Sequence, residues 1–302
     1  MKKLIIIIPY FGTKPKWLNF FLASLAFNPE IDWLFISDFE IEHKPKNCTH
    51  LFVKFEEYKF FVSKQLNVQF APEAPYKLCD LKPALGFLHR DYVENYQFWG
   101  YSDVDLVYGD LLGAYEELLN SYDVISSHSW LLAGHFSIFR TMNETILLFS
   151  MHQNWKSAFL TPHYISFDEA HMTEYLFENV ATPFRKLKHE KALETFKKIG
   201  GLTLKLLFKE RYTTFMGEGL LLPGGALTQP NIWTWNTGQV NNDVMTESII
   251  YSHFSFWNSG RWNEGNDPNA GIWKRNTSTA YPNIEWDEIK KFTISKEGFA
   301  LL

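Results

Sequence analysis

The strongest constraint on the fold is a run of β-branched residues near the N-terminus, within the segment LIIIIPY at positions 4–10. A continuous apolar run of this kind is typical of a strand that is covered on both faces. Apolar residues then recur at helical spacing over 14–28, where Asn28 and Pro29 end the helix, and a second strand is predicted over 32–38. Strand, helix and strand at this spacing form a βαβ unit, which predicts a parallel sheet.

The same alternation of strands and helices continues along most of the chain. Further strands are predicted over 50–55, 97–103, 123–128 and 135–141, and helices over 73–96, 110–122, 143–155 and 166–180. The basic, amphipathic stretch from 184 to 215 is predicted to be helical, and aromatic, strand-like segments follow it. With 46% hydrophobic residues, the chain has ample material for a core. We therefore expect one α/β domain over residues 1–302, with a mostly parallel central sheet and an elaborated C-terminal half.

Composition argues against several kinds of protein. The net charge of −5 lacks the basic balance that nucleic-acid-binding proteins usually show. Two cysteines, Cys48 and Cys79, cannot form a disulfide framework and are expected to be reduced thiols in a cytoplasmic protein. The apolar run from Leu4 to Ile8 is too short for a secretion signal or a membrane span, so we interpret it as a buried strand.

Two acidic residues mark the end of the strand predicted over 97–103, in the segment FWGYSDVDLVYGDL: Asp103 is its last residue and Asp105 follows it. Asp103 and Asp105 are two positions apart, which on an extended chain places them on one face, roughly 6–7 Å apart. Carboxylates this close repel unless a cation lies between them, and Mg²⁺ and Mn²⁺ prefer oxygen ligands. In open α/β sheets, ligands bind at the carboxyl ends of strands. The pattern therefore predicts a metal and diphosphate site.

The alternative is purely structural: Asp103 or Asp105 caps the following turn or forms an ion pair with Lys82. Asp110, which comes just before the helix predicted over 110–122, is expected to be its N-cap rather than a ligand. Asp80 is likewise expected to be the N-cap of a helix within 73–96, with Pro83 in the first turn of that helix.

The chain resembles bacterial GT-A-fold glycosyltransferases of capsular polysaccharide and lipopolysaccharide assembly. The segments that carry the resemblance are IIIIPYFG, YKLCDLKPALG, FWGYSDVDLVYGDL, GHFSIFR, SFDE and YSHF, which occur in the same order between about residues 4 and 257. The resemblance implies a GT-A-like domain with a Rossmann-like sheet, in which residues 1–115 bind the nucleotide sugar and residues 116–302 bind the acceptor. It also implies a nucleotide-sugar donor, usually a UDP-sugar, and Mn²⁺ or Mg²⁺ bound by Asp103 and Asp105, with His253 of YSHF completing the metal site.

The resemblance further implies which residues approach the nucleotide sugar. These are Pro9, Tyr10, Phe11, Ser37, Asp38, Lys77, Asp80, Lys82, Ser102, Asp103 and Val104. A lysine there is expected to neutralise phosphate. One departure is that SFWNSGRW follows His253, where related chains have basic residues, so we expect Arg261 or the metal to oppose the diphosphate charge instead.

For transfer, the acceptor hydroxyl needs a general base, which in inverting enzymes of this fold lies at the start of a later helix. SFDEAHM supplies Asp168 as the expected base and Glu169 as a donor or acceptor contact. The alternatives are a helix with an acidic first turn, which its dipole stabilises, or a retaining enzyme without such a base.

Several residues are expected on the acceptor and donor-sugar side. Gly134 permits close backbone approach, and His135 is either a sugar contact or a hydrogen-bonded core residue. Trp235, with Trp233 and Trp257, is a candidate for stacking on sugars, although each is also a candidate for the core. The basic stretch over 185–211 is either a solvated helix pair or a peripheral contact with anionic lipid, which would suit a lipid-linked acceptor.

Two other functions remain open at this point. One is a nucleotidyltransferase or other metal-dependent phosphate-transfer enzyme, although the Gly-rich phosphate loop of many such enzymes is missing. The other is a non-catalytic carbohydrate-binding protein, which would explain the aromatic residues but not the paired acids.

Overall fold

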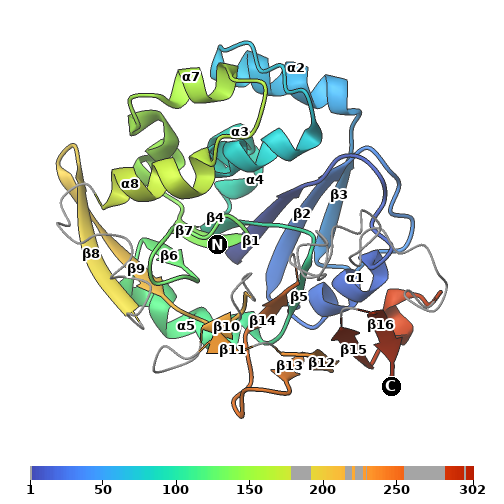
Figure 1. Cartoon of the computed structure of the whole chain (residues 1–302). Coiled ribbons are helices and arrows are strands. Elements are labelled where there is room, and N and C mark those ends of the chain that lie inside the picture. Colours follow the sequence, from blue (N-terminus) through green and yellow to red (C-terminus); the bar gives the residue numbers. More distant parts are fainter. Residues whose placement is uncertain are drawn as a thin grey trace.

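The fold is built around an eight-stranded sheet with helices on both faces (Figure 1). The structure is a computed structural model and describes residues 2–177, 192–214, 220–221, 227–228, 230–254, 283–295 and 297–302. Strand order in the sheet is β3-β2-β1-β4-β7-β6-β9-β8. The strands are β1 (Lys2–Pro9), β2 (Ile31–Ser37), β3 (Cys48–Phe52), β4 (Tyr96–Ser102), β6 (Val124–Ser126), β7 (Phe136–Arg140), β8 (Ala192–Ile199) and β9 (Leu202–Lys209).

Parallel pairs hold the first half of this sheet together. β1 pairs in parallel with β2 and β4, β2 with β3, and β6 with β9, whereas β7 and β8 are antiparallel to their neighbours. The βαβ unit predicted at the N-terminus is present as β1, α1 (Leu18–Ala26) and β2. The expected α/β class and mostly parallel central sheet are confirmed, and the arrangement is consistent with a GT-A-like fold.

The isoleucine run of β1 explains why both faces of the sheet are covered. Alternate residues of a strand point to opposite faces, so Ile6 and Ile8 enter one apolar cluster while Ile5 and Ile7 enter another. The first cluster lies under α1 and α5 (Leu111–Ser121), and the second under the remaining helices, which Figure 1 shows on the opposite side. A strand with only one buried face would not tolerate this sequence.

The helices of the second face are short and interrupted. They are α2 (Phe55–Leu66), the 3-10 helix η1 (Pro75–Ala84), α3 (Leu85–Leu88), α4 (Arg90–Val93), α6 (Asn143–Ile146), the 3-10 helix η2 (Leu148–Met151), α7 (Trp155–Leu160), the π-helical turn η3 (Phe167–His171) and α8 (Met172–Leu176). The continuous helices predicted over 73–96, 143–155 and 166–180 are therefore wrong in detail. None of the helices within the described ranges combines the length and apolar character that crossing a bilayer requires.

The C-terminal part adds small antiparallel sheets, drawn in orange and red in Figure 1. One has the order β13-β12-β15-β16, and a separate ribbon joins β14 to β5. A third pair joins β10 to β11. The elements of these small sheets are β5 (Leu106–Tyr108), β10 (Leu220–Leu221), β11 (Leu227–Thr228), β12 (Ile232–Asn236), β13 (Gln239–Asn242), β14 (Tyr251–His253), β15 (Lys291–Ser295) and β16 (Gly298–Leu301), and the 3-10 helix η5 (Trp286–Glu288) precedes β15. The strand-like character predicted for the C-terminal third is present in its described residues.

The basic segment predicted to be helical over 184–215 is wrong where the structure describes it. Residues 192–209 form the hairpin β8–β9, with Ile199 paired to Leu202 across the two glycines Gly200 and Gly201. Gly200 has φ +59°, a conformation that a two-residue hairpin turn needs and glycine adopts freely. The two glycines and the alternation in LTLKLLFK are strand signals that the helical interpretation overlooked; residues 184–191 lie outside the described part.

Gly100 of β4 tests how closely the central strands pack. A Cβ atom at this position would lie 2.6 Å from the backbone oxygen of Ser137 on β7. Gly100→Ala is expected to lower the free energy of unfolding by about 1–3 kcal/mol, because the crowded neighbour is backbone and must move. The control is Gly201→Ala in the hairpin turn, where no atom lies within 4 Å and the effect should be small. Chemical denaturation measures both, and equal midpoints for the two variants would contradict this packing.

Candidate active site

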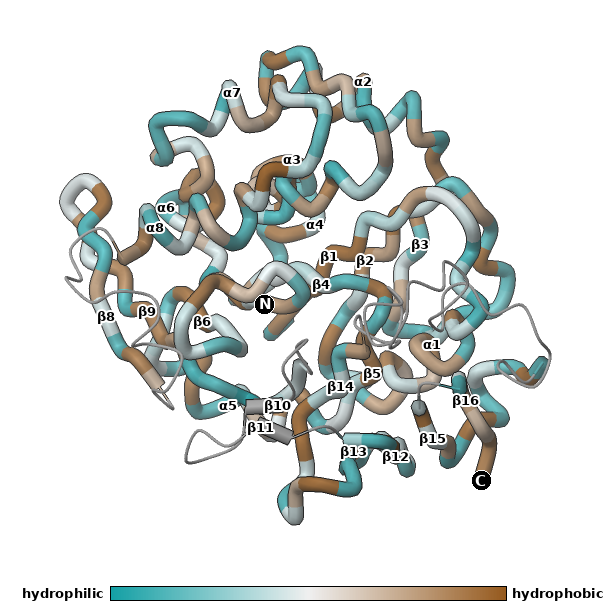
Figure 2. The backbone as a smooth tube through the Cα atoms, in the orientation of Figure 1, coloured by the Kyte–Doolittle hydropathy of each residue, from teal (hydrophilic) through white to brown (hydrophobic). Residues whose placement is uncertain are grey.

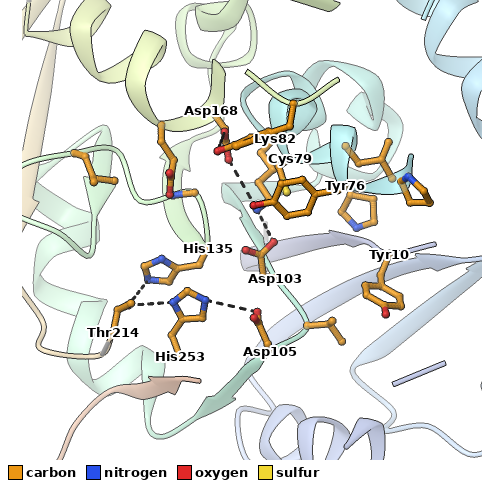
Figure 3. Close-up of a pocket in the computed structure, with 18 of the residues that line it drawn as sticks. Tyr10, Tyr76, Cys79, Lys82, Asp103, Asp105, His135, Asp168, Thr214 and His253 are labelled. Atoms are coloured by element: carbon orange, nitrogen blue, oxygen red, sulfur yellow. Dashed lines mark hydrogen bonds and ion pairs between the residues drawn. The ribbon is translucent and has the colours of Figure 1, made fainter. Parts of the chain in front are cut away.

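A cavity of about 550 Å³ opens where β1 and β4 end. Figure 3 shows acidic, basic and imidazole side chains pointing into it from several elements. The cavity is lined by Pro9, Tyr10, Phe11, Pro75, Tyr76, Leu78, Cys79, Lys82, Asp103, Val104, Asp105, His128, Trp130, Leu131, Gly134, His135, Tyr164, Asp168, Glu169, Thr214 and His253. Its position at the carboxyl ends of parallel strands is where open α/β sheets bind ligands.

Asp103, Asp105 and His253 converge at one side of the cavity. Asp103 and Asp105 belong to the turn between β4 and β5, and β5 pairs antiparallel with β14 so that Leu106 lies opposite His253. This pairing brings the imidazole next to the carboxylates, and one ligand atom from each residue lies within 4.8 Å of the others. The three residues that the sequence associated with a metal thus form one cluster.

The chemistry of this cluster fits a divalent cation. Burial and the nearby charge of Asp103 raise the pKa of Asp105 to about 7. The shift means that a second negative charge beside Asp103 is unfavourable without a cation. Burial, together with the charges of His128 and Lys82, lowers the pKa of His253 well below its usual value, so its imidazole is neutral, the form that binds metals. Its Nε2 atom lies 3.7 Å from Oδ1 of Asp105. A cation between these atoms would offset the repulsion of the two carboxylates.

Thr214 orients the histidine of this cluster. Its hydroxyl lies 3.1 Å from Nδ1 of His253, which leaves Nε2 facing Asp105 (Figure 3). The same hydroxyl lies 3.3 Å from Nε2 of His135, whose ring stacks on His253 with centroids 4.2 Å apart. Metal-binding histidines usually have their second nitrogen held by such a partner, which sets the tautomer and the ring orientation.

Lys82 joins this cluster to a second pair of acids. Its ammonium lies 2.5 Å from Oδ1 of Asp103 and 3.9 Å from Oδ2 of Asp168, and its side chain is almost fully buried. Burial opposes the charge of Lys82, but the charge of Asp103, with smaller contributions from Cys79 and Asp168, outweighs it and raises the pKa of the amine. The ion pair between Asp103 and Lys82, which the sequence offered as the structural alternative, is therefore present alongside the metal-binding geometry.

Asp168 and Glu169 lie across the cavity on η3. Burial raises the pKa of Asp168 well above its usual value, with Lys82 opposing and Glu169 adding to the shift. Burial also raises the pKa of Glu169, whose Oε1 accepts a hydrogen bond of 3.2 Å from the backbone nitrogen of Gly134. A Cβ atom at Gly134 would lie 2.6 Å from Oδ2 of Asp168 and 2.7 Å from Oε1 of Glu169, so any larger residue here would displace the two carboxylates from these positions.

Asp80 and Lys77 support η3 from outside the cavity. Asp80 is fully buried, pairs with Lys77 at 2.6 Å, and accepts backbone hydrogen bonds from Ile165 and Phe167 at 3.0 and 2.6 Å. The expectation that Asp80 caps a helix is wrong, because it lies inside η1 and binds the segment that precedes Asp168. The prediction that Lys77 and Asp80 approach a nucleotide is also wrong, because their side chains are buried, pair with each other and do not line the cavity.

Other predicted residues lie away from the cavity lining. Ser37 is buried and donates to the carbonyl of Phe39, Asp38 accepts from the backbone nitrogen of Gly12, and Ser102 bonds the hydroxyl of Tyr108. Stacking of sugars on Trp235 or Trp233 is wrong, because both indoles are 1% exposed and belong to the core. Arg261 and Trp257 lie outside the described residues. The N-cap predicted at Asp110 is confirmed by its bond to the nitrogen of Gly113.

Sequence reasoning missed several residues of the cavity wall. Tyr76 and Tyr164 form an edge-to-face pair at its rim, with ring centroids 4.9 Å apart. His128 also lines the cavity, where its Nδ1 lies 3.2 Å from Glu210, and its ring stacks on that of Trp130. Tyr76 is the first residue of the segment YKLCDLKPALG, which was a usable signal, whereas nothing local marks the others as cavity residues.

Comparisons with known proteins identify a family but not an activity. A sequence profile described as "Family of unknown function (DUF6625)" matches residues 6–299, and the chain belongs to this family. No curated protein matches the chain. A crystal structure of the galactosyltransferase LgtC in complex with donor and acceptor sugar analogues aligns with 57% of this chain and 70% of its own, at 12% identity and a TM-score of 0.34. A likeness of this size carries no conclusion about function.

Thr214→Val tests whether the cluster is an oriented cation site. Valine keeps the shape but cannot hold Nδ1 of His253, so Mn²⁺ affinity is expected to fall about 10–100-fold by titration calorimetry. Thr214→Ser retains the hydroxyl and should bind Mn²⁺ nearly as well as the unmodified protein. Melting temperatures monitor folding, and equal affinity for the valine and serine variants would refute the orienting role.

Proposed function

We propose that this protein of the DUF6625 family is a metal-dependent glycosyltransferase that moves a sugar from a nucleotide sugar, most simply a UDP-sugar, to a glycan acceptor. The observation that carries the proposal is that Asp103, Asp105 and His253 face the acids Asp168 and Glu169 across one cavity, with Lys82 between the two groups. A phosphate-binding cation site and a carboxylate base on opposite sides are what glycosyl transfer requires.

The donor would lie between the end of β1 and the cation cluster. Asp103, Asp105 and His253 would hold Mn²⁺ or Mg²⁺, which when bound supplies positive charge for the diphosphate leaving group. Pro9, Tyr10 and Phe11 line the cavity directly after β1 and offer a partly apolar wall for the base and ribose. Tyr10 remains a neutral phenol, since burial and the charges of Asp105 and Asp38 raise its pKa to about 12.

Asp168 is the proposed general base of an inverting reaction. As the acceptor hydroxyl attacks the anomeric carbon, its proton passes to Oδ of Asp168, and the bond between that carbon and the diphosphate breaks. The raised pKa makes Asp168 a stronger proton acceptor than an exposed aspartate, and Lys82 stabilises its charged form. Glu169, fixed by the nitrogen of Gly134, would position the donor or acceptor hydroxyls.

The acceptor would enter beside the aromatic rim. Tyr76 is 66% exposed and pairs with Tyr164, and Trp130 lines the same cavity. Flat rings at a cavity mouth pack well on the C–H faces of sugars. With the sequence resemblance to transferases of capsule and lipopolysaccharide assembly, this suggests a glycan or lipid-linked glycan acceptor, made at the cytoplasmic face of a bacterial membrane.

Nucleotide binding tests the donor site. Addition of Mn²⁺ and UDP together is expected to raise the melting temperature of the protein, with UDP alone giving much less. Asp105→Asn and Asp103→Asn should abolish the metal-dependent part, because the diphosphate loses its bridging cation. Asp110→Asn is the matched control, since asparagine also caps α5. Retention of the full shift in Asp105→Asn would exclude the proposed site.

The base is tested by separating donor binding from transfer. A panel of nucleotide sugars is assayed for Mn²⁺-dependent release of the nucleotide, with and without simple sugar acceptors. With the best donor, Asp168→Asn is expected to lower turnover about 10²–10⁴-fold while the affinity for UDP and Mn²⁺ stays within about twofold. Glu174→Gln, an exposed acid on the adjacent helix α8, should remain fully active. Normal turnover in Asp168→Asn would assign the base elsewhere.

A further inference from the structure

The hairpin β8–β9 forms one end of the central sheet and carries a charge opposite to that of the whole protein. Figure 1 shows it projecting along the edge of the molecule, with the turn at Gly200–Gly201 away from the body. Over 192–209 it contains four lysines and one glutamate, whereas the chain has a net charge of −5. β8 is the last strand in the sheet order, so among the described strands only β9 pairs with it.

One face of this hairpin presents an aromatic ring between lysines. Phe196 is paired with Lys205, and cross-strand partners point to the same face; Lys198, two positions along β8, points there too. Phe196 is 60% exposed and both lysines are exposed. Leu202, which is paired with Ile199, points to the other face, but it directly follows the turn and is 38% exposed. Figure 2 shows apolar and polar positions alternating along this edge of the molecule.

Two other charged residues of the hairpin, Lys197 and Glu194, have partners of their own. Lys197 points to the opposite face, where its ammonium donates to the carbonyl of Tyr175 at 2.6 Å and lies 3.8 Å from the centre of that ring. Glu194 lies farther from the turn and accepts a hydrogen bond from Tyr122. Near the turn, the exposed side chains are Phe196, Lys198, Leu202, Thr203 and Lys205.

Protection of a sheet edge explains only part of this surface. Lysines on an edge strand prevent pairing with another chain, which accounts for Lys198 on β8 but not for Lys205, because β9 pairs with a strand on each side. The exposed Phe196 and Leu202 work against such protection, because exposed apolar side chains favour association with another chain. Apolar side chains flanked by lysines are instead the combination that binds a bilayer interface, where rings enter the headgroup region and ammonium groups meet lipid phosphates.

We propose that the β8–β9 turn rests on an anionic lipid bilayer, with Phe196 and Leu202 in the headgroup region and Lys198 and Lys205 on the phosphates. The role of this contact, which is to bring the cavity to a lipid-linked acceptor, rests on the proposed function. β9 runs from the turn to Glu210, which bonds the cavity residue His128, a span of about 26 Å at the usual rise of a strand. A bilayer at the turn would thus lie near enough for a lipid-linked glycan to reach the cavity.

The experiment is co-sedimentation of the full chain with vesicles of phosphatidylcholine, alone or mixed with phosphatidylglycerol. The protein should bind the mixed vesicles and not the neutral ones, and salt should weaken binding. Lys198→Gln with Lys205→Gln is expected to weaken binding about 30-fold, from about 1 kcal/mol for each lysine. Phe196→Ser should also weaken it. The control pair Lys46→Gln with Lys64→Gln removes two exposed lysines elsewhere and should bind normally.

Several results would overturn this contact: no binding of the unmodified protein to anionic vesicles, equal loss in the control pair, or unchanged binding of Phe196→Ser. Sedimentation without vesicles tests the rival occupant, a second copy of the chain; a dimer that Phe196→Ser dissociates would also overturn it. The same variants should keep the stabilisation by UDP and Mn²⁺. If the unmodified protein lacks that stabilisation but binds vesicles, the proposed function fails and the membrane contact stands.

Discussion

The buried ammonium group of Lys82 is the interaction on which the cavity depends. Among the described residues that line the cavity, four are carboxylic acids, and Lys82 is the one lysine or arginine that faces them. It contacts Asp103 on the β4 side and approaches Asp168 on η3, so it joins the two halves of the site. Because charges interact strongly in a buried site of low dielectric constant, this one positive charge offsets part of the repulsion between Asp103 and Asp168.

A second buried ion pair explains how η3 is held opposite the cation cluster. Replacing a buried pair by apolar residues often costs nothing, so Lys77 and Asp80 are poorly explained by stability alone. Asp80, however, also accepts backbone hydrogen bonds from Ile165 and Phe167, directly before Asp168. The charge pair therefore fixes the backbone that carries the proposed base, and η1 serves as a scaffold for the site and supplies Lys82 to it.

The C-terminal part completes the cluster through strand pairing rather than through the central sheet. β14 pairs with β5, which places His253 beside Asp105, and the backbone of Thr213 accepts a hydrogen bond from the nitrogen of His253. Thr214 then orients the imidazole from the segment that leaves β9. Residues separated by more than a hundred positions meet here because the two short strands β5 and β14 pair with each other.

The sequence alone determined features that depend on neighbouring residues: the isoleucine strand of β1, the βαβ unit, the paired aspartates after β4, and the cap at Asp110. The family resemblance added His253, Asp168 and Lys82, which the fold brings to one cavity. Only the tertiary structure decided that Asp80 and Lys77 face inward, that Trp235 is core, that Thr214 and His128 line the cavity, and that 192–209 is a hairpin. These features depend on contacts between segments that are far apart in the sequence. The spacing of neighbouring residues does not encode which side chains such contacts bury or pair.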